Sequence, residues 1–313
     1  MAFAGDLTVM PSRRWLRAKQ ILDAAELIPA SEMTQFVTKE CGDDIELRHE
    51  VETLLALDGH AVIPKHFEPH PEDIPEVPQL IEDFRLVGLL GKGGTGSVYR
   101  AVRETDGYTA AIKLSQLSST NQQVRRQGIL ETLRHPNIPR LISKGKVSGV
   151  WKYVIREFVD GIPAHQWIAA RTDGGRGALD RFLKVCSIAA YLHANGIVHG
   201  DLKPANILVS ADNEPHLIDF GNAVRPGSKD TRMKHDIARF TPAFASPEQM
   251  SGGRITPASD VYSLGVWLAQ ITTNTGYAEN PGLAATLQKA KSTDPSSRHA
   301  TAQDLYDEVL AVS

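Results

Sequence analysis

The sequence predicts an α+β protein in which a small all-helical module precedes a region of strands and then a region of helices. Three patterns support this fold class. Apolar residues recur at helical spacing within residues 12–61, and an apolar, β-prone run begins at Phe84. Further along, residues 178–195 have the pattern of an amphipathic helix, and residues 301–312 are typical of a last helix that closes the domain.

The composition sets broad limits on the class of protein. A chain of 313 residues is long enough for one large domain and a small one, and its 42% of hydrophobic residues supports a real core. The formal net charge of −3 argues against a protein that binds nucleic acid or an anionic membrane. No apolar run approaches the ~18 residues that a transmembrane helix needs.

The N-terminal sequence and the two cysteines indicate the cellular compartment of the protein. The first residues lack the basic start and the apolar core of a secretion signal. Cys41 and Cys186 are too few and too far apart to suggest a disulfide framework, and they fit idle or buried thiols in a reducing compartment. We therefore expect a cytoplasmic protein.

Residues 1–61 are predicted to form the helical module. Its second helix carries Phe36 and Val37 and is expected to stop at Gly42, after which an aspartate, Asp43 or Asp44, can cap a third helix. Three such helices can bury one another's apolar stripes in a small bundle. The stripes of the first and third helices are Trp15, Ala18, Ile21, Leu22 and Ala25, then Leu47, Val51, Leu54 and Leu55.

Residues 62–83 are predicted to be a linker between the module and the strands. Proline at high density prevents helix and favours an extended, semi-rigid chain. A loop packed across the surface of the following domain is the alternative. The prolines of this stretch are Pro64, Pro69, Pro71, Pro75 and Pro78.

A glycine-rich loop follows the first predicted strand and contains Gly91, Gly93 and Gly96. Glycine lets the backbone come close to phosphate oxygens, to which the loop amides can donate hydrogen bonds. Another strand follows the loop instead of a helix, so the pattern is not a dinucleotide-binding fingerprint. A phosphate-binding loop is therefore predicted, with a flexible turn as the alternative.

The stretch HGDLKPAN, residues 199–206, combines groups that phosphoryl transfer requires. Asp201 can accept a proton from an attacking hydroxyl, Lys203 can neutralise charge on the phosphoryl group, and Asn206 can hold a metal ion through its side-chain oxygen. Thirteen residues after Asn206, Asp219 adds a second metal-binding group behind a hydrophobic stretch. An ordinary polar surface loop is the alternative.

These two stretches resemble, in order and spacing, the catalytic loop and the metal-binding loop of protein kinases. Residues 110–113 resemble the third-strand motif of the same family, residues 154–161 its hinge, and residues 240–249 the peptide-binding loop of its serine/threonine members. The resemblance covers residues 84–313. It implies a two-lobed fold, whose β-rich lobe and hinge occupy residues 84–160 and whose helical lobe occupies residues 161–313.

The resemblance implies a serine/threonine protein kinase that moves the γ-phosphoryl group of ATP to a protein hydroxyl. Asp201 would orient and deprotonate the hydroxyl, and Lys203 would stabilise developing charge. Thr241 would hydrogen-bond both side chains and favour an aliphatic alcohol as the nucleophile. Asn206 and Asp219 would hold Mg²⁺.

The nucleotide-binding residues are implied in the same way. The glycine loop would cover the phosphates, and Lys113 would contact the α- and β-phosphates. Five residues would surround adenine, either through hinge backbone groups or through apolar side chains on the two faces of the base. They are Glu157 and Val159 at the hinge, Val98 and Ala111 on one face, and Leu208 on the other.

One position departs from the family pattern and places the activity in question. Counting back nine residues from His135 puts Arg126 where kinases carry the helix C glutamate that pairs with the lysine equivalent to Lys113. A cation cannot replace that glutamate, because like charges repel at close range. Three alternatives remain: Asp219 alone steers Lys113, helix C is remodelled, or a short helix C lets Glu131 swing in.

Two further positions differ from many kinases. Gly200 stands where many have an arginine that reads a phosphate on the activation loop, so we expect activation by loop phosphorylation to be weak or missing. Arg156 borders the back of the adenine pocket, where an apolar residue is usual. A buried unpaired arginine is costly, so Arg156 needs a nearby carboxylate or a path to water.

Three residues are expected to act as structural ties. The resemblance implies that Glu248 pairs with Arg298 and that Asp260 anchors the backbone of the catalytic loop from a central helix. Residues 12–61 also resemble the short helical module that precedes the catalytic domain in many bacterial serine/threonine kinases, where it would serve as a docking site for a partner or as a stabilising cap. An ATP-binding pseudokinase that acts as a scaffold through these helices is the alternative to a signalling kinase with a protein substrate.

Overall fold

The computed structural model describes most of the chain from residue 77 onward: residues 77–93, 96–116, 131, 133–169, 176–226, 240–273, 277 and 279–313. Before residue 77 it describes residues 33–42 together with Arg17, Ile21, Ala25, Asp44, Leu47, Arg48 and Val51. The predicted linker up to residue 76 and the helix C position Arg126 lie outside the described residues.

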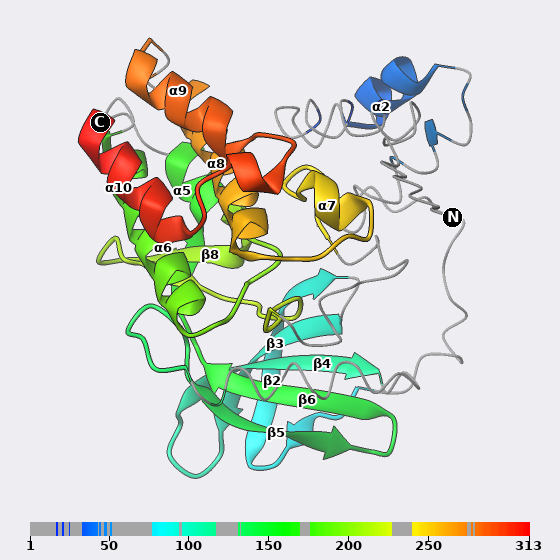
Figure 1. Cartoon of the computed structure of the whole chain (residues 1–313). Coiled ribbons are helices and arrows are strands. Elements are labelled where there is room, and N and C mark those ends of the chain that lie inside the picture. Colours follow the sequence, from blue (N-terminus) through cyan, green and yellow to red (C-terminus); the bar gives the residue numbers. More distant parts are fainter. Residues whose placement is uncertain are drawn as a thin grey trace, which may run out of the picture.

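The first lobe is an antiparallel six-stranded sheet in the order β1-β2-β3-β4-β6-β5, at the bottom of the view in Figure 1. Its strands are β1 (Leu80–Ile81), β2 (Phe84–Gly93), β3 (Gly96–Arg103), β4 (Thr109–Gln116), β5 (Leu141–Val147) and β6 (Trp151–Glu157). Strand β1 lies within the stretch predicted to be linker. It belongs to the sheet because Ile81 is fully buried and pairs with Phe84.

The two faces of this sheet have different neighbours. Ile112 and Ile155 lie opposite each other on β4 and β6, and both are fully buried in the apolar core of the lobe. Because side chains alternate along a strand, Ala111 and Lys113 lie on the other face, where they are only partly buried. That face carries three of the residues predicted to contact the nucleotide, namely Val98, Ala111 and Lys113.

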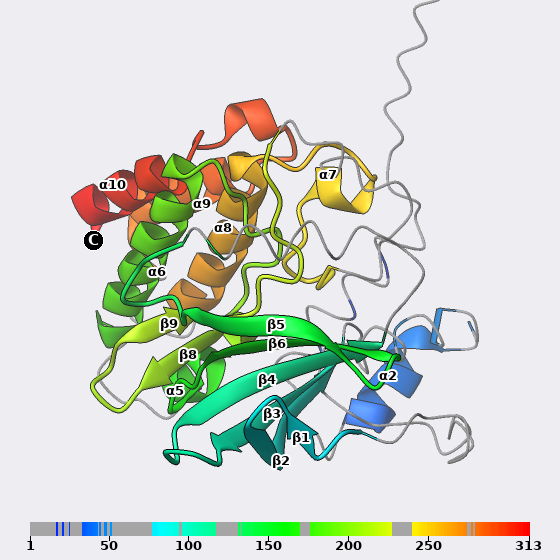
Figure 2. The ribbon, with the colours of Figure 1, turned by 90° about the horizontal axis from the view of Figure 1, so that it is seen from below.

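The second lobe is mainly helical and lies on the other side of the molecule from the sheet in both views (Figures 1 and 2). Its helices are α5 (Ala164–Ala169), α6 (Arg176–Ala194), α7 (Pro247–Met250), α8 (Pro257–Thr273), α9 (Pro281–Ala290) and α10 (Ala302–Val312). Short 3₁₀ turns form at η2 (Pro204–Asn206) and η5 (Pro295–Ser297). A three-stranded antiparallel sheet completes the lobe, in the order β7 (Gly161–Pro163), β8 (Ile207–Ser210) and β9 (Pro215–Leu217).

The core of the helical lobe surrounds helix α8. Most residues of α8 are buried, and the Trp267 ring meets Phe182 of helix α6 edge-on at a centroid distance of 5.5 Å. The helices predicted at residues 178–195 and 301–312 are confirmed as α6 and α10. Helix α10 begins where predicted because Thr301 and Asp304 form a reciprocal capping box.

The described part of the N-terminal module has an apolar cluster of its own. Helix α2 (Met33–Cys41) buries residues at every fourth position, Met33, Val37 and Cys41. Gly42 ends the helix with φ +55°, and Asp44 accepts a hydrogen bond from the Leu47 amide at 2.8 Å, so Asp44 is the capping aspartate. The cluster also contains Ile21, Ala25, Leu47 and Val51. Within the part of the chain that the structure describes, no helix is both long and apolar enough to span a bilayer.

Candidate active site

The catalytic loop is held at its backbone by the two helices beneath it. Asp260 of α8 accepts hydrogen bonds from the His199 amide and the Gly200 amide, each at 2.8 Å. Gln249 of α7 donates from Nε2 to the Gly200 carbonyl oxygen at 2.7 Å. The predicted anchoring by Asp260 is confirmed. The contribution of Gln249 was not predicted, because nothing in its local sequence indicates where its side chain points.

The polar groups of the loop converge on Asp201. Asn206 donates from Nδ2 to the Asp201 carboxylate at 3.1 Å and to its backbone carbonyl at 2.8 Å. The Thr241 amide donates to the other carboxylate oxygen at 3.3 Å, and Lys203 Nζ lies 3.9 Å from the carboxylate while it donates to Thr241 Oγ1. The four side chains, separated in sequence by up to 40 positions, therefore form one cluster.

Lys113 of β4 and Asp219 form the second half of the site. Lys113 Nζ donates to both carboxylate oxygens of Asp219, at 2.7 and 2.9 Å. Burial by itself would raise the pKa of the Asp219 carboxyl. The Lys113 charge, with smaller help from Arg156 and the Gly221 amide, outweighs burial and lowers that pKa to about 2. Asp219 is therefore an anion at neutral pH. Separately, its backbone adopts a φ of +48°, which is unfavourable for a residue other than glycine.

This pairing bears on the three alternatives for Lys113. The carboxylate that holds Lys113 in the structure is that of Asp219. Glu131 is paired instead with Lys144 of β5, at 2.6 Å, so the idea that Glu131 swings in to meet Lys113 is wrong for this structure. The remaining alternatives involve Arg126 and helix C, which lie outside the described residues.

The oxygen ligands of the site suit magnesium. Asn206 turns its Nδ2 toward Asp201, which makes Oδ1 the atom that would hold a cation, and Asp219 supplies carboxylate oxygens. Within the described residues no group of three or more His, Cys, Asp or Glu side chains forms a cage for a metal ion. Mg²⁺ does not need one, because it is usually held by one or two protein oxygens, by substrate phosphates and by water.

Two of the residues predicted to surround the nucleotide, Val98 and Ala111, lie beside Lys113 in the sheet. Val98 of β3 is directly opposite Lys113 in the β3–β4 ladder, so both side chains and that of Ala111 share one face of the sheet. Leu208 lies on β8 of the helical lobe, and Glu157 ends β6, with Val159 two residues further on. The Glu157 carboxylate turns away to Arg140, whose Nε lies at 2.5 Å.

The glycines of the loop differ in whether the fold leaves room for a side chain at their positions. A Cβ added at Gly96 would lie 2.1 Å from the Leu114 carbonyl oxygen, and its φ of +133° is one that side chains rarely permit. A Cβ at Gly91 would meet nothing within 4 Å. Gly93 pairs with Gly96 across the β2–β3 hairpin. Gly96 is thus a requirement of the fold itself, whereas Gly91 leaves open space beside the sheet.

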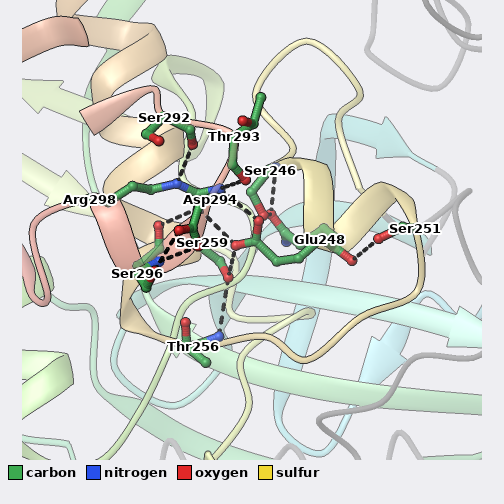
Figure 3. Close-up of polar contacts among 12 residues, drawn as sticks. Ser246, Glu248, Ser251, Thr256, Ser259, Ser292, Thr293, Asp294, Ser296 and Arg298 are labelled. Carbon is green, nitrogen blue, oxygen red and sulfur yellow. Dashed lines mark hydrogen bonds and ion pairs between the residues drawn. The ribbon is translucent and has the colours of Figure 1, made fainter. Parts of the chain in front are cut away.

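A buried ion pair joins Glu248 of α7 to Arg298, which follows η5 (Figure 3). Arg298 donates from Nη1 and Nη2 to the two Glu248 oxygens at 2.9 and 2.8 Å, and the Arg298 side chain is fully buried. Ser259 of α8 donates to Glu248 at 2.7 Å, and the Ser292 carbonyl accepts from Arg298 Nε at 2.7 Å. The predicted pair is confirmed, and it ties α7 to α8 and to the segment that leads into η5.

Arg156, for which the sequence named no partner, lies on β6 directly opposite Ala111 of β4. Its guanidinium stacks over the Phe220 ring, with Cζ 5.2 Å from the ring centroid, and its Nη1 atom is buried and has no hydrogen-bond partner among the residues that the structure describes. Burial lowers the pKa of Arg156 to about 10, against the opposing charge of Asp219. The arginine therefore keeps its charge at neutral pH.

Comparison with known proteins agrees with this geometry. Residues 84–312 match the family described as the protein kinase domain. The chain is 32% identical over 214 residues to the serine/threonine-protein kinase Pkn1 of Myxococcus xanthus, covering 65% of this chain and 31% of that protein. It is 35% identical over 213 residues to the serine/threonine-protein kinase PkaA of Streptomyces coelicolor, covering 61% and 38%.

A third relative, the serine/threonine-protein kinase PknB of Mycobacterium leprae, is 32% identical over 209 residues, which cover 63% of this chain and 33% of that protein. The alignments thus span well under half of these bacterial proteins. The family match, in contrast, takes in both lobes and every element that carries the site. The chain belongs to the protein kinase domain family.

Proposed function

We propose that this chain transfers the γ-phosphoryl group of ATP to serine or threonine hydroxyl groups of a protein substrate. The observation that carries the proposal is the convergence of Asn206, Lys203 and Thr241 on the Asp201 carboxylate. Phosphoryl transfer depends mainly on positioning and on electrostatic stabilisation, so an ordered cluster of this kind supports an active enzyme.

Each residue has a defined task in this reaction. The Asp201 carboxylate accepts the proton of the attacking hydroxyl, and the Thr241 amide and Asn206 Nδ2 hold its two oxygens in place. Lys203, which donates to Thr241 Oγ1, stabilises the negative charge that develops on the transferred group. Mg²⁺, when bound through Asn206 and Asp219, neutralises the phosphates.

Thr241 supports an aliphatic alcohol as the acceptor. Its hydroxyl is bonded to Lys203 and its amide to Asp201, so it ties the segment that resembles a peptide-binding loop directly to the catalytic residues. The relatives are named as serine/threonine kinases, which favours the same acceptor.

Replacing the proposed base tests the function. Incubation of the purified chain with labelled ATP, Mg²⁺ and a generic protein substrate is expected to give label transfer that falls at least ~100-fold in Asp201→Ala, since general-base catalysis is worth about 10² to 10⁴ in rate. Asp307→Ala, at an exposed position of α10, is the matched control and is expected to retain full transfer. Equal label in wild type and Asp201→Ala, or label in neither, would leave the nucleotide-binding pseudokinase as the function.

The domain organisation proposed with this function has four parts. They are the helical module of residues 1–61, the linker of residues 62–83 with its strand β1, the sheet lobe to residue 160 and the helical lobe to residue 313. We also propose residues 12–61 as the surface that docks a partner protein, which a pull-down with residues 1–80 tests. Capture of the same proteins by a chain that lacks residues 1–76 would contradict that role.

A further inference from the structure

Arg156 belongs to the sheet face that carries Lys113. Strands β4 and β6 are neighbours in the sheet, and Arg156 lies directly opposite Ala111 in their ladder (Figure 1). Directly opposite residues share a face, and so do residues two apart along a strand, so Arg156, Ala111 and Lys113 all lie on the face away from the lobe core. Arg156 is thus beside the residues proposed to bind the nucleotide.

The guanidinium reaches from one lobe to the other. Arg156 comes from β6 of the sheet, whereas the Phe220 ring under it is 2% exposed and belongs to the core of the helical lobe. Phe220 directly follows Asp219, the partner of Lys113. We call the meeting place of Lys113, Arg156, Asp219 and Phe220 the lobe junction.

The lobe junction carries more positive than negative charge. Lys113 and Arg156 each bring one positive charge, and Asp219, whose two oxygens are both engaged by Lys113, brings one negative charge. The carboxylates of Glu157 and Glu131 are turned elsewhere, to Arg140 and Lys144. In the described part of the chain, no second carboxylate pairs with Lys113 or Arg156.

Arg156 also has hydrogen-bonding capacity that no described residue uses. Its buried Nη1 makes no hydrogen bond within the described part of the chain, although a buried unpaired donor costs free energy of folding. Burial weakens the screening of its charge by solvent, so the charge acts on neighbouring groups more strongly than that of an exposed arginine. The weakly screened charge favours a polyanion that binds beside the lobe junction.

We propose that Arg156 makes this site bind the triphosphate of a nucleotide without a divalent cation. The negative charge of a nucleoside triphosphate must be balanced by cations, and in many phosphoryl-transfer enzymes Mg²⁺ provides most of that positive charge. Here Lys113 and Arg156 together supply two positive charges against one carboxylate. The inference rests on the nucleotide site of the proposed function, but it concerns binding alone and does not require phosphoryl transfer.

Calorimetric titration of the full chain with ATP, once in EDTA and once in excess Mg²⁺, tests the proposal. Wild type is expected to bind ATP in EDTA at least ~10-fold more tightly than adenosine, because one favourable charge interaction of about 1.4 kcal/mol is a factor of ten in affinity. Binding of ATP in EDTA that is no tighter than that of adenosine would overturn the proposal, and this comparison needs no variant.

Variants then assign the effect to the charge of Arg156. Arg156→Met keeps an apolar contact with Phe220 and is expected to lose about tenfold in ATP affinity in EDTA but less than about threefold in Mg²⁺. Arg156→Lys keeps the charge and is expected to bind ATP in EDTA as wild type does. An equal loss for Arg156→Met in both buffers would mean a structural role and would contradict the proposal.

The matched control is Arg103→Met. Arg103 also stacks on an aromatic ring of this sheet, with Cζ 4.9 Å from the Phe84 centroid, but it lies on the face that carries the lobe core. Its replacement is expected to leave ATP affinity in EDTA unchanged, and a loss as large as that of Arg156→Met would overturn the assignment. Metal-free ATP binding without label transfer would contradict the kinase function alone, and label transfer without metal-free binding would contradict this inference alone.

Discussion

Gly200 determines the course of the catalytic loop immediately before Asp201. Its φ is +77°, its amide donates to Asp260, and its carbonyl oxygen accepts from Gln249. A Cβ at this position would lie 2.9 Å from the Asn222 carbonyl oxygen. The loop therefore has no room for the arginine that many kinases carry here. Weak dependence on activation-loop phosphorylation stays a prediction.

Two glycine-to-alanine substitutions separate the cost of a left-handed backbone from the cost of a steric clash between the new Cβ and Asn222. Gly200→Ala is expected to destabilise the chain by about 2 kcal/mol or more. A left-handed backbone costs alanine ~1–2 kcal/mol, and the new Cβ also clashes with the Asn222 carbonyl oxygen. Gly149→Ala, with φ +70° and nothing within 4 Å, is expected to pay the backbone term alone and to keep full label transfer. Denaturant unfolding and the transfer assay check both. Equal losses in the two variants would show that the collision with Asn222 is relieved at no cost.

At the scale of elements, buried polar groups fasten the helices to the catalytic loop. His193 at the end of α6 contacts Asp260 at 3.0 Å, and its Nδ1 accepts from the Ala302 amide at the start of α10. The same ring cannot donate from Nδ1 while it accepts there, so the proton lies on Nε2. The His193 ring thus links the start of α10 to Asp260 of α8, and the Asp260 carboxylate also holds the loop.

The Glu248–Arg298 pair gives a stability prediction at this scale. Glu248→Gln leaves Arg298 buried without its counter-charge, so we expect a loss of about 3–5 kcal/mol in the free energy of unfolding at pH 7. Glu279→Gln, at an exposed position, is the matched control and is expected to change it by less than ~0.5 kcal/mol. Urea unfolding of the three chains measures both effects.

The same pair makes the stability depend on pH. Burial would raise the pKa of Glu248, but hydrogen bonds from Arg298 and Ser259 outweigh it and lower that pKa below its usual 4.5. A carboxyl with a depressed folded pKa stabilises fully above its unfolded pKa and less as the pH falls through the folded value. The difference between wild type and Glu248→Gln is therefore expected to shrink below about pH 4.5. A difference that stays constant down to pH 3 would show that the charge of Glu248 is not involved.

Across the whole molecule, the apolar residues form separate cores. The cluster of the N-terminal module contains Ile21, Val37 and Val51 and shares no member with the clusters of the sheet or of the helical lobe. The segment between β4 and β5 crosses to the helical lobe, since Leu133 and Ile138 belong to the core of that lobe. Beside this apolar packing, the lobes meet through Lys113 with Asp219 and through Arg156 with Phe220.

Removal of residues 1–76 tests the independence of the module. The remaining chain is expected to keep its thermal midpoint within about 5 °C, since a change of 1 kcal/mol in stability shifts a domain of this size by roughly 2–4 °C. Its label transfer is expected to match that of the full chain. Calorimetry and the transfer assay measure both, and loss of a cooperative transition would show that the module is a cap on which the lobes depend.

Much of the fold and of the site followed from local patterns. Local patterns located α6 and α10. Residue types, together with the kinase resemblance, predicted Asp201, Asn206 and Asp219 as site residues, because carboxylate and amide oxygens suit proton acceptance and magnesium binding. Strand β1 was missed, since its two residues are too few to show a period. The pairing of Glu248 with Arg298 was available because the family resemblance supplied it.

The sequence alone thus predicted the fold class, which the family match confirms, and it supplied the proposed chemistry of the site, because helical spacing and motif order are properties of short stretches of chain. Only the tertiary structure decided the partners of individual charges. Lys113 meets Asp219 across 106 positions and Gln249 meets Gly200 across 49, while Arg156 packs on Phe220 and Glu131 pairs with Lys144. These contacts depend on how two lobes come together, and the charge of a single side chain does not specify which of several opposite charges it will reach.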